Sequence, residues 1–258
     1  MITSSQNSKV KWIRQLQESS RERRQAGVFV VEGVRLVEEA LFRGWPARLI
    51  LYSEEISERG KSVVQGFLQK SVETYEVASS VLRSASDTDT PQGLLAVLQA
   101  QALPIPEALD FVFVPDSVRD PGNLGTMLRT AAATGVQAVL IPPGTVDPFS
   151  PKVLRSAMGA HFCLPVLVQD WNSLKELVQR HALHSFLAAA GAAAVYTSVN
   201  FTQPLAVIVG GEAEGASQEA QLIANETIQI PMSGQVESLN AAVAAAVLFY
   251  EVVRQRRQ

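Results

Sequence analysis

The stretch FVFVPDSVRDPGNLGTMLRTAAATG, residues 111–135, sets the fold class of this chain. Its first five residues are apolar, which predicts a buried strand. Apolar residues then recur with the spacing of one helix face, at Leu124, Met127, Leu128 and Ala131. Asn123 is expected at or near the N-cap of this helix, and Gly135 is a typical helix stop. A strand that leads through a polar loop into a helix is the repeating unit of an open α/β sheet, and ligands bind at such loops.

The same pattern continues to the C-terminus. Short apolar runs predict strands at residues 111–115, 138–141, 162–168, 185–190, 205–210 and 227–231. The intervening helices, and a final Ala-rich helix over about 241–257, favour a mainly parallel, buried sheet. Cys163 is the single cysteine, so an internal disulfide and a Cys-based zinc site are both excluded. We expect Cys163 to be a small buried hydrophobe in the strand at 162–168.

The first hundred residues predict a smaller α/β unit of their own. Helices are expected over 7–19, 36–42 and about 58–70, and strands at 27–31, 48–52, near Tyr75 and at 92–98. An aperiodic stretch with two prolines follows. We therefore expect an N-terminal domain at 1–100, a linker at 101–107 and a second domain at 108–258.

The composition allows a sizeable core and does not by itself indicate a nucleic-acid binder. The 258 residues are 47% hydrophobic and 18% charged, with a net charge of −3. Residues 1–48 hold nine basic and five acidic side chains, so this stretch carries +4 and the remainder −7. Two interpretations fit this asymmetry: local binding of phosphates, or an ordinary solvated helix face.

The sequence indicates neither a membrane protein nor a metalloprotein. The N-terminus has no apolar run like that of a signal peptide, and no segment has about 18 consecutive apolar residues. We expect a soluble, cytoplasmic protein. The three histidines, His161, His181 and His184, form no obvious ligand cluster, so no metal is implied.

Two further polar loops follow predicted strands. In GGEAEG, residues 210–215, the first two glycines allow the backbone to approach a ligand closely, and Glu212 follows at the strand end. This loop lacks the glycine spacing of a dinucleotide site and the Lys-Ser/Thr of a P-loop, which counts against a nucleotide-binding metabolic enzyme. The third loop, IPMSGQVESLN at 230–240, leads into the Ala-rich helix, and either Ser238 or Asn240 could be an ordinary N-cap.

Arg129 lies about a turn and a half after Asn123, on a helix that starts beside the predicted ligand crevice. Its guanidinium could bind a phosphate with two hydrogen bonds or pair with a surface carboxylate. The first loop alone does not decide between these roles.

Taken together and in this order, the segments at 123–129, 210–215 and 230–240 resemble the three motifs of the SpoU (TrmH-like) RNA 2′-O-ribose methyltransferases of the SPOUT superfamily. The resemblance covers about residues 116–257, and residues 1–100 look more loosely like the family's RNA substrate-binding extension. It implies an α/β fold with a mostly parallel sheet, helices on both faces and a trefoil-knotted C-terminus, in a homodimer that uses S-adenosyl-L-methionine. Gly211 departs from the pattern, because many relatives have Asn there.

The resemblance also implies roles for particular residues. The positions that match the family's cofactor site are Gly210, Gly211, Ile230, Met232 and Leu239. The positions that match its catalytic and RNA-facing residues are Asn123, Arg129, Glu212, Ser238 and Asn240. The basic candidates for contacts with the RNA backbone are Lys9, Lys11, Arg14, Arg21, Arg23 and Arg24.

The function implied is methyl transfer from S-adenosylmethionine to a ribose 2′-hydroxyl, with ribosomal RNA favoured as the substrate. The alternatives are the same chemistry on transfer RNA, or a non-catalytic RNA-binding assembly factor. We expect Arg129 to clamp a phosphate and stabilise the developing alkoxide, because a guanidinium with a pKa above about 12 is a poor proton acceptor. Asn123, Ser238 and Asn240 are expected to orient the ribose, and Glu212 to hold Arg129 or a loop amide.

Overall fold

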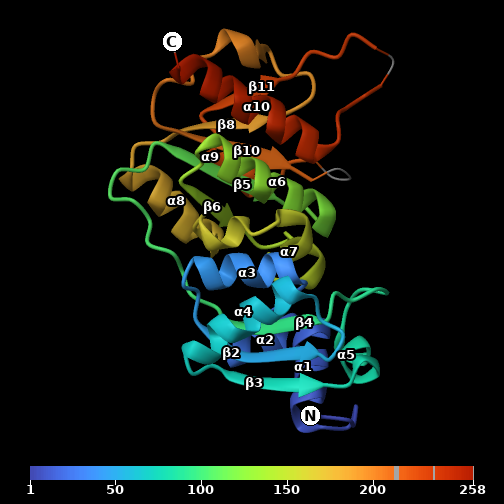
Figure 1. The fold of residues 1–258 in the computed structure, drawn as a ribbon. Coiled ribbons are helices and arrows are strands. Elements are labelled where there is room, and N and C mark those ends of the chain that lie inside the picture. The colour runs from blue at the N-terminus through green and yellow to red at the C-terminus, as the bar shows by residue number, and fades with distance from the viewer. Residues whose placement is uncertain (212–214, 235, 258) are drawn as a thin grey trace. The chain divides into compact units, whose positions relative to one another are not determined.

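The structure, a computed structural model, describes residues 1–211, 215–234 and 236–257. These residues form two compact units (Figure 1). The first consists of Met1–Gln101 together with Phe149–Phe162, and the second of Ala102–Pro148 together with Cys163–Gln258.

The first unit, whose residues are all described, is built on a mixed four-stranded sheet in the order β1-β4-β2-β3. Its strands are β1 (Val28–Glu32), β2 (Ala47–Ser53), β3 (Glu73–Val77) and β4 (Leu94–Gln99). Strand β4 pairs antiparallel with β1 and β2, and β2 pairs parallel with β3. The helices from the N-terminal part of the chain are α1 (Ser8–Glu18), α2 (Ser20–Ala26), α3 (Val34–Phe42), α4 (Glu58–Gln69) and α5 (Ser79–Ala85).

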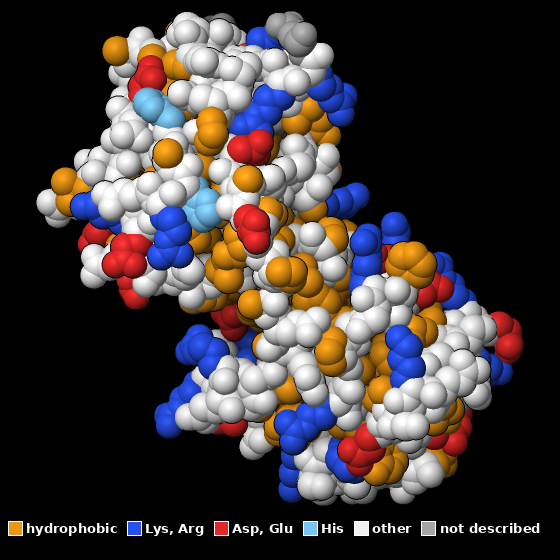
Figure 2. Space-filling model, turned by 90° about the vertical axis from the view of Figure 1, so that its left-hand side faces the viewer, with side chains coloured by type: hydrophobic (Ala, Val, Ile, Leu, Met, Phe, Trp, Pro, Cys, Tyr) orange, Lys and Arg blue, Asp and Glu red, His pale blue; other side chains and the backbone are white. Residues whose placement is uncertain are grey.

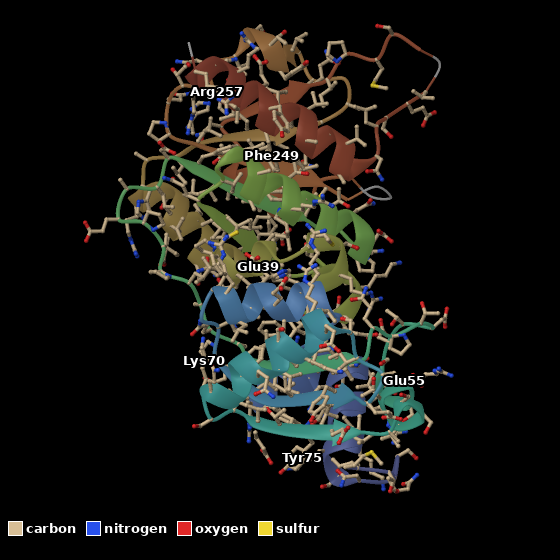
Figure 3. All side chains as sticks on the ribbon, in the orientation of Figure 1. Glu39, Glu55, Lys70, Tyr75, Phe249 and Arg257 are labelled. Atoms are coloured by element: carbon tan, nitrogen blue, oxygen red, sulfur yellow. The ribbon has the colours of Figure 1, made fainter. Side chains whose placement is uncertain are left out.

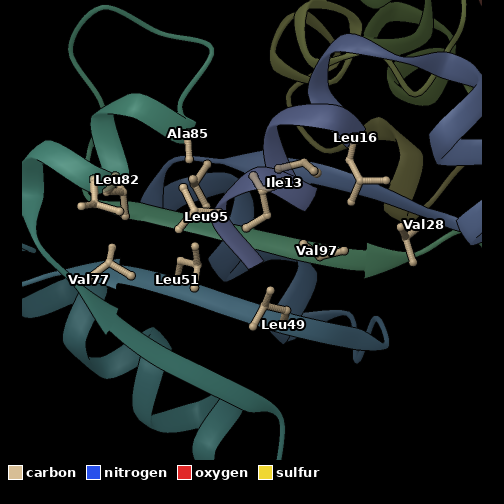
Figure 4. Packing of buried hydrophobic residues seen from close by; sticks show 13 residues of the cluster. Ile13, Leu16, Val28, Leu49, Leu51, Val77, Leu82, Ala85, Leu95 and Val97 are labelled. Atoms are coloured by element: carbon tan, nitrogen blue, oxygen red, sulfur yellow. The ribbon is translucent and has the colours of Figure 1, made fainter. Parts of the chain in front are cut away.

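One face of this sheet carries a core beneath α1 and α5 (Figure 4). Ile13 and Leu16 of α1 are fully buried there against alternate strand residues such as Leu95 and Val97. The period of two in the strands and of 3.6 in the helix places these side chains on facing surfaces. The predicted helix at 7–19 is confirmed, with Asn7 as its N-cap.

A segment from much later in the chain completes the first unit. It contains α7 (Pro151–Ala157) and the short 3₁₀ helix η1 (Ala160–Phe162). The ring of Phe149 lies 5.2 Å from that of Phe29, and the ring of Phe162 lies 5.1 Å from that of Trp45. These aromatic contacts with buried residues explain why the segment belongs to this unit.

The second unit holds a sheet in which, over the described residues, seven strands pair entirely in parallel. Their order is β7-β6-β5-β10-β8-β11-β9. The strands are β5 (Phe111–Asp116), β6 (Ala138–Ile141), β7 (Val166–Val168), β8 (His184–Ala188), β9 (Ala194–Val195), β10 (Leu205–Gly210) and β11 (Glu226–Gln229). The prediction of a mostly parallel sheet is confirmed.

Helices cover both faces of this sheet. On one face α8 (Trp171–Arg180) and α9 (Gln218–Ile223) pack on a core that includes Val112 and Val114. On the other face lie α6 (Pro121–Thr134) and α10 (Ala241–Arg256), which pack against each other. Phe249 of α10, labelled in Figure 3, lies 5.8 Å from Phe111 and 4.9 Å from Phe113 between ring centroids. Burial on both faces explains the continuous apolar runs of the central strands.

Helix α6 begins earlier than the sequence suggested. Its N-cap is Asp120, whose carboxylate accepts a hydrogen bond from the Asn123 N–H at 2.8 Å. Pro121 occupies the first helical position, where a missing N–H costs nothing. The prediction of Asn123 at the N-cap is therefore corrected: its side chain lies inside the first turn and is left available for another partner.

The strand predicted at 162–168 is also shorter than expected. Phe162 is the last residue of η1 in the first unit, and β7 spans only Val166–Val168 of the second. The chain leaves one unit for the other between Phe162 and Cys163, and Pro165, which has no N–H, precedes the strand. Cys163 is exposed in this connection, so the prediction of a buried strand residue was wrong.

A membrane-spanning helix would need a longer apolar run than any helix in the described part of the chain provides. The longest connections instead carry the polar loops that end β5, β10 and β11.

Candidate active site

A cavity of about 910 Å³ opens in the second unit, beside β11 and at the carboxyl ends of β8 and β10. This is where ligands bind in open parallel sheets. The cavity walls include all five residues predicted to bind the cofactor: Gly210, Gly211, Ile230, Met232 and Leu239. Ser238 lines it as well. The structure thus brings the second and third polar loops together around one cavity.

The wall of the cavity at β10 is made of backbone. A Cβ atom on Gly210 would lie 2.8 Å from the Ala216 nitrogen, closer than real Cβ contacts come. A Cβ on Gly211 would overlap the carbonyl oxygen of Ser117. Both positions therefore require glycine, and main-chain N–H and C=O groups replace side chains as the surface offered to a ligand.

The charge of the wall restricts the ligand. Among the described residues that line the cavity, none is Lys, Arg or His, whereas Glu226 and Glu237 both contribute. A ligand with several phosphates would meet carboxylates without a neutralising cation. The wall suits an uncharged or positively charged ligand of nucleoside size better than a dinucleotide.

Asn240 connects the third motif to the first. As the N-cap of α10, its Oδ1 accepts hydrogen bonds from the N–H groups of Ala242 at 2.9 Å and Val243 at 3.3 Å. Its Nδ2 donates to Oδ1 of Asn123 at 3.1 Å, across 117 residues of sequence. The two capping bonds fix which atom of the Asn240 amide is oxygen, so the nitrogen must face Asn123. Two helix N-termini therefore meet here, and both favour negative charge.

The other predicted catalytic residues lie near this junction or outside the described residues. Arg129 is exposed on α6, two turns or less from Asn123. Ser238 is exposed at the cavity wall, two residues before Asn240. Glu212 lies outside the described residues.

Sequence reasoning missed Asp116, the last residue of β5. Its carboxylate is fully buried and bonded on both oxygens, to the Ser217 N–H at 2.6 Å and the Ser117 hydroxyl at 3.1 Å. The available signal was a charged residue directly after an apolar strand, at the edge of the sheet where ligands bind.

The basic residues of the N-terminal helices have different surroundings. Lys11, Arg21 and Arg24 are exposed. Lys9 donates to Glu73 at 2.6 Å, and this hydrogen bond raises the pKa of Lys9 and lowers that of Glu73. Arg14 donates to the Ser5 carbonyl at 2.5 Å. In Figure 2, Lys and Arg side chains are spread over the visible face with acidic side chains between them.

Arg23 is not a surface residue. Only 6% of it is exposed, and its guanidinium donates to the carbonyls of Leu16 at 2.5 Å and Gln17 at 3.0 Å. These are among the last carbonyls of α1, which have no partner within that helix. The prediction of Arg23 as an RNA contact is therefore corrected, because its donors serve the packing of α1 against α2.

Comparison with known proteins identifies both parts of the chain. Residues 110–250 match the model of the SpoU rRNA Methylase family, and residues 7–96 match that of the MRM3-like substrate binding domain. A Bacillus subtilis protein named 23S rRNA (guanosine(2553)-2′-O)-methyltransferase RlmP is 35% identical over 97% of this chain and 98% of its own length. An uncharacterised tRNA/rRNA methyltransferase of Synechocystis is 38% identical, over 99% of this chain and 94% of its own length.

Solved structures agree with these similarities. The SpoU methyltransferase AviRb of Streptomyces viridochromogenes, crystallised with AdoMet, superposes with a TM-score of 0.86 at 29% identity. That match covers 97% of this chain and 99% of the other. An AdoMet-bound rRNA methyltransferase of Sinorhizobium meliloti gives a TM-score of 0.88 at 27% identity, over 98% and 97% of the two chains.

The structural role of Arg23 predicts that Arg23→Ala lowers the free energy of unfolding by roughly 1–3 kcal/mol, because buried carbonyls lose their donor. Arg24→Ala, which removes the exposed neighbour, should change it by about 0.5 kcal/mol or less. Urea unfolding followed by circular dichroism measures both values. Equal effects of the two substitutions would contradict the structural role of Arg23.

Proposed function

The chain belongs to the SpoU rRNA methylase family, and from this premise we propose that it transfers the methyl group of S-adenosylmethionine to a ribose 2′-hydroxyl of ribosomal RNA. The observation that carries the proposal is the glycine-walled cavity without cations, which the Asn240–Asn123 bond joins to the helix bearing Arg129. Relatives named as 23S rRNA 2′-O-methyltransferases support ribosomal RNA over transfer RNA.

The cavity fits this cofactor. S-adenosylmethionine has no phosphate, and its sulfonium gives it a net positive charge that Glu226 and Glu237 favour. Gly210, Gly211, Ile230, Met232 and Leu239 would hold it, largely through main-chain groups and apolar contacts. When bound, the cofactor supplies an electrophilic methyl group.

The residues around the Asn240–Asn123 bond would position the other reactant. Methyl transfer is an in-line displacement, so alignment of the 2′-oxygen contributes much of the rate. Asn123, Ser238 and Asn240 would orient the ribose, and Arg129 would bind the adjacent phosphate and stabilise negative charge on the oxygen. Glu212 would hold Arg129 or a loop amide. The RNA phosphate or another group, rather than the strongly basic guanidinium, would take the proton.

The wider assembly follows from the same family. The chain returns from β11, near one edge of the sheet, to α10, which packs on α6, and we propose that segment 230–240 completes a trefoil knot on this path. Val243 and Tyr250 of α10 are 49% and 57% exposed, which suits a homodimer contact. Residues 1–100 would bind the RNA, residues 101–107 would link the domains, and 108–258 would carry the chemistry. Action on ribosomal RNA would place the protein in the cytoplasm.

Calorimetric titration with S-adenosylmethionine tests the cofactor site. We expect wild type to bind and Gly210→Trp to lose measurable binding, since even a Cβ at this position crowds the Ala216 nitrogen. Ala193→Trp, a change at an exposed residue outside the cavity lining, should bind like wild type. Absence of binding by folded wild type would contradict the proposed function.

The Asn240–Asn123 bond can be separated from the capping role of Asn240. Asn240→Ser should keep the N-cap, with a stability change of a few tenths of a kcal/mol, but is too short to reach Asn123. Its rate of methyl transfer to ribosomal RNA should fall more than about tenfold at saturating cofactor. Asn240→Ala should additionally lose about 1 kcal/mol of stability. A wild-type rate in Asn240→Ser would show that the bond serves only the fold.

Exposed basic residues of α1 and α2 are expected to contact the RNA backbone. Replacing Lys11, Arg21 and Arg24 together by Gln should weaken RNA binding and flatten its salt dependence by about 0.7–0.9 per lost phosphate contact. Replacing Arg59, Lys61 and Lys70 of the α4 region removes the same charge from another surface and is the control. Filter binding across a salt series would reject the assignment if both triple variants behave alike.

A further inference from the structure

Asp116 is a buried charge that the chemistry described so far does not use. It is the last residue of β5 and is 0% exposed. Burying a carboxylate is costly unless its oxygens accept hydrogen bonds, and both do here. The bond from the Ser217 N–H, at 2.6 Å, is short, as expected for an ionised acceptor.

The partner of this bond connects Asp116 to the cavity wall. Ser217 is the N-cap of α9 and directly follows Gly215 and Ala216, which both line the cavity. Gly215 in turn forms a β-bridge with Gly211, and Gly210 is the register partner of Asp116 in the sheet. A single carboxylate, 101 residues away in sequence, therefore fixes the end of the wall segment whose start is fixed by the sheet.

The second bond of Asp116 holds a strained residue at the same crossing. Ser117 has φ of +54°, in the left-handed region that non-glycine residues rarely adopt. In this conformation its carbonyl lies against the backbone of Gly211, where no Cβ fits, and its hydroxyl donates to Asp116 at 3.1 Å. Strained backbone of this kind is retained where the surrounding structure fixes it, commonly beside ligand sites.

We propose that Asp116 is a positioning residue for the cofactor: its carboxylate holds Gly210, Gly211 and Gly215–Ser217 in the shape that receives S-adenosylmethionine. This inference rests on the proposed function. Asp116 does not line the cavity, so it acts through the backbone and not by contact with the ligand.

The test compares Asp116→Asn with Asp110→Asn in the full-length protein. Asp110, just before the other end of β5, forms an exposed ion pair with Arg256 at 3.0 Å, so its variant is the matched control. Asp116→Asn keeps the shape of the side chain but removes the charge. We expect its Kd and KM for S-adenosylmethionine to rise about tenfold, with kcat at saturating cofactor and KM for RNA changed less than about threefold. Asp110→Asn should leave all four values unchanged.

A measurement without cofactor separates this inference from the proposed function. Hydrogen exchange of a peptide spanning Ser217 should be faster in Asp116→Asn than in wild type, and unchanged in Asp110→Asn. Unchanged exchange, or cofactor affinity within twofold of wild type, would overturn the positioning role. A proportional fall of kcat, RNA binding and cofactor binding would also overturn it, because it would indicate partial unfolding. If wild type itself bound no cofactor, the proposed function would fail, and the exchange data would still decide whether Asp116 holds the loop.

Discussion

The site depends on the parallel pairing of β5 with β10. The register runs from Phe111 opposite Leu205 to Asp116 opposite Gly210, so both strands end at the same level. Polar loops that are far apart in the sequence therefore leave the sheet side by side. A slip by one residue would exchange the two faces of the strand and bury the wrong side chains. The packing of Phe111 and Phe113 against Phe249 therefore also secures the geometry of the loops.

Close backbone approach is the second constraint, and it explains the composition of the loops. Gly210 and Gly211 leave no room for a Cβ because the chain at Ala216 and Ser117 passes directly against them. Asp116 satisfies the polar groups that this crossing buries, and Asn240 does the same at the start of α10. The wall of the cavity is thus backbone held by a few side chains behind it, which suits a ligand recognised by main-chain groups.

Much of this could be predicted from the sequence, for physical reasons that also mark the limits. Strands buried on both faces give unbroken apolar runs, so the parallel sheet was predictable, and loops after strands marked the cavity residues. Contacts between distant segments leave no local signal. The rings of Phe149 and Phe162 belong to the first unit, and Arg23 closes a helix end, because of partners that periodicity does not reveal. Asn123 was misplaced by three residues because Asp120-Pro121 is an equally good helix start.

The distribution of charge makes the two halves of the proposed reaction compatible. RNA brings closely spaced phosphates, which bind wherever cations gather. The described lining of the cavity has carboxylates and no cation, whereas Arg129 is exposed on α6 and Lys11, Arg21 and Arg24 are exposed in the first unit. Phosphates are therefore repelled from the cavity and attracted to surfaces outside it. The positively charged cofactor and the negatively charged substrate each have a site that disfavours the other, and the Asn240–Asn123 bond lies where the two sites must meet for the methyl group to pass.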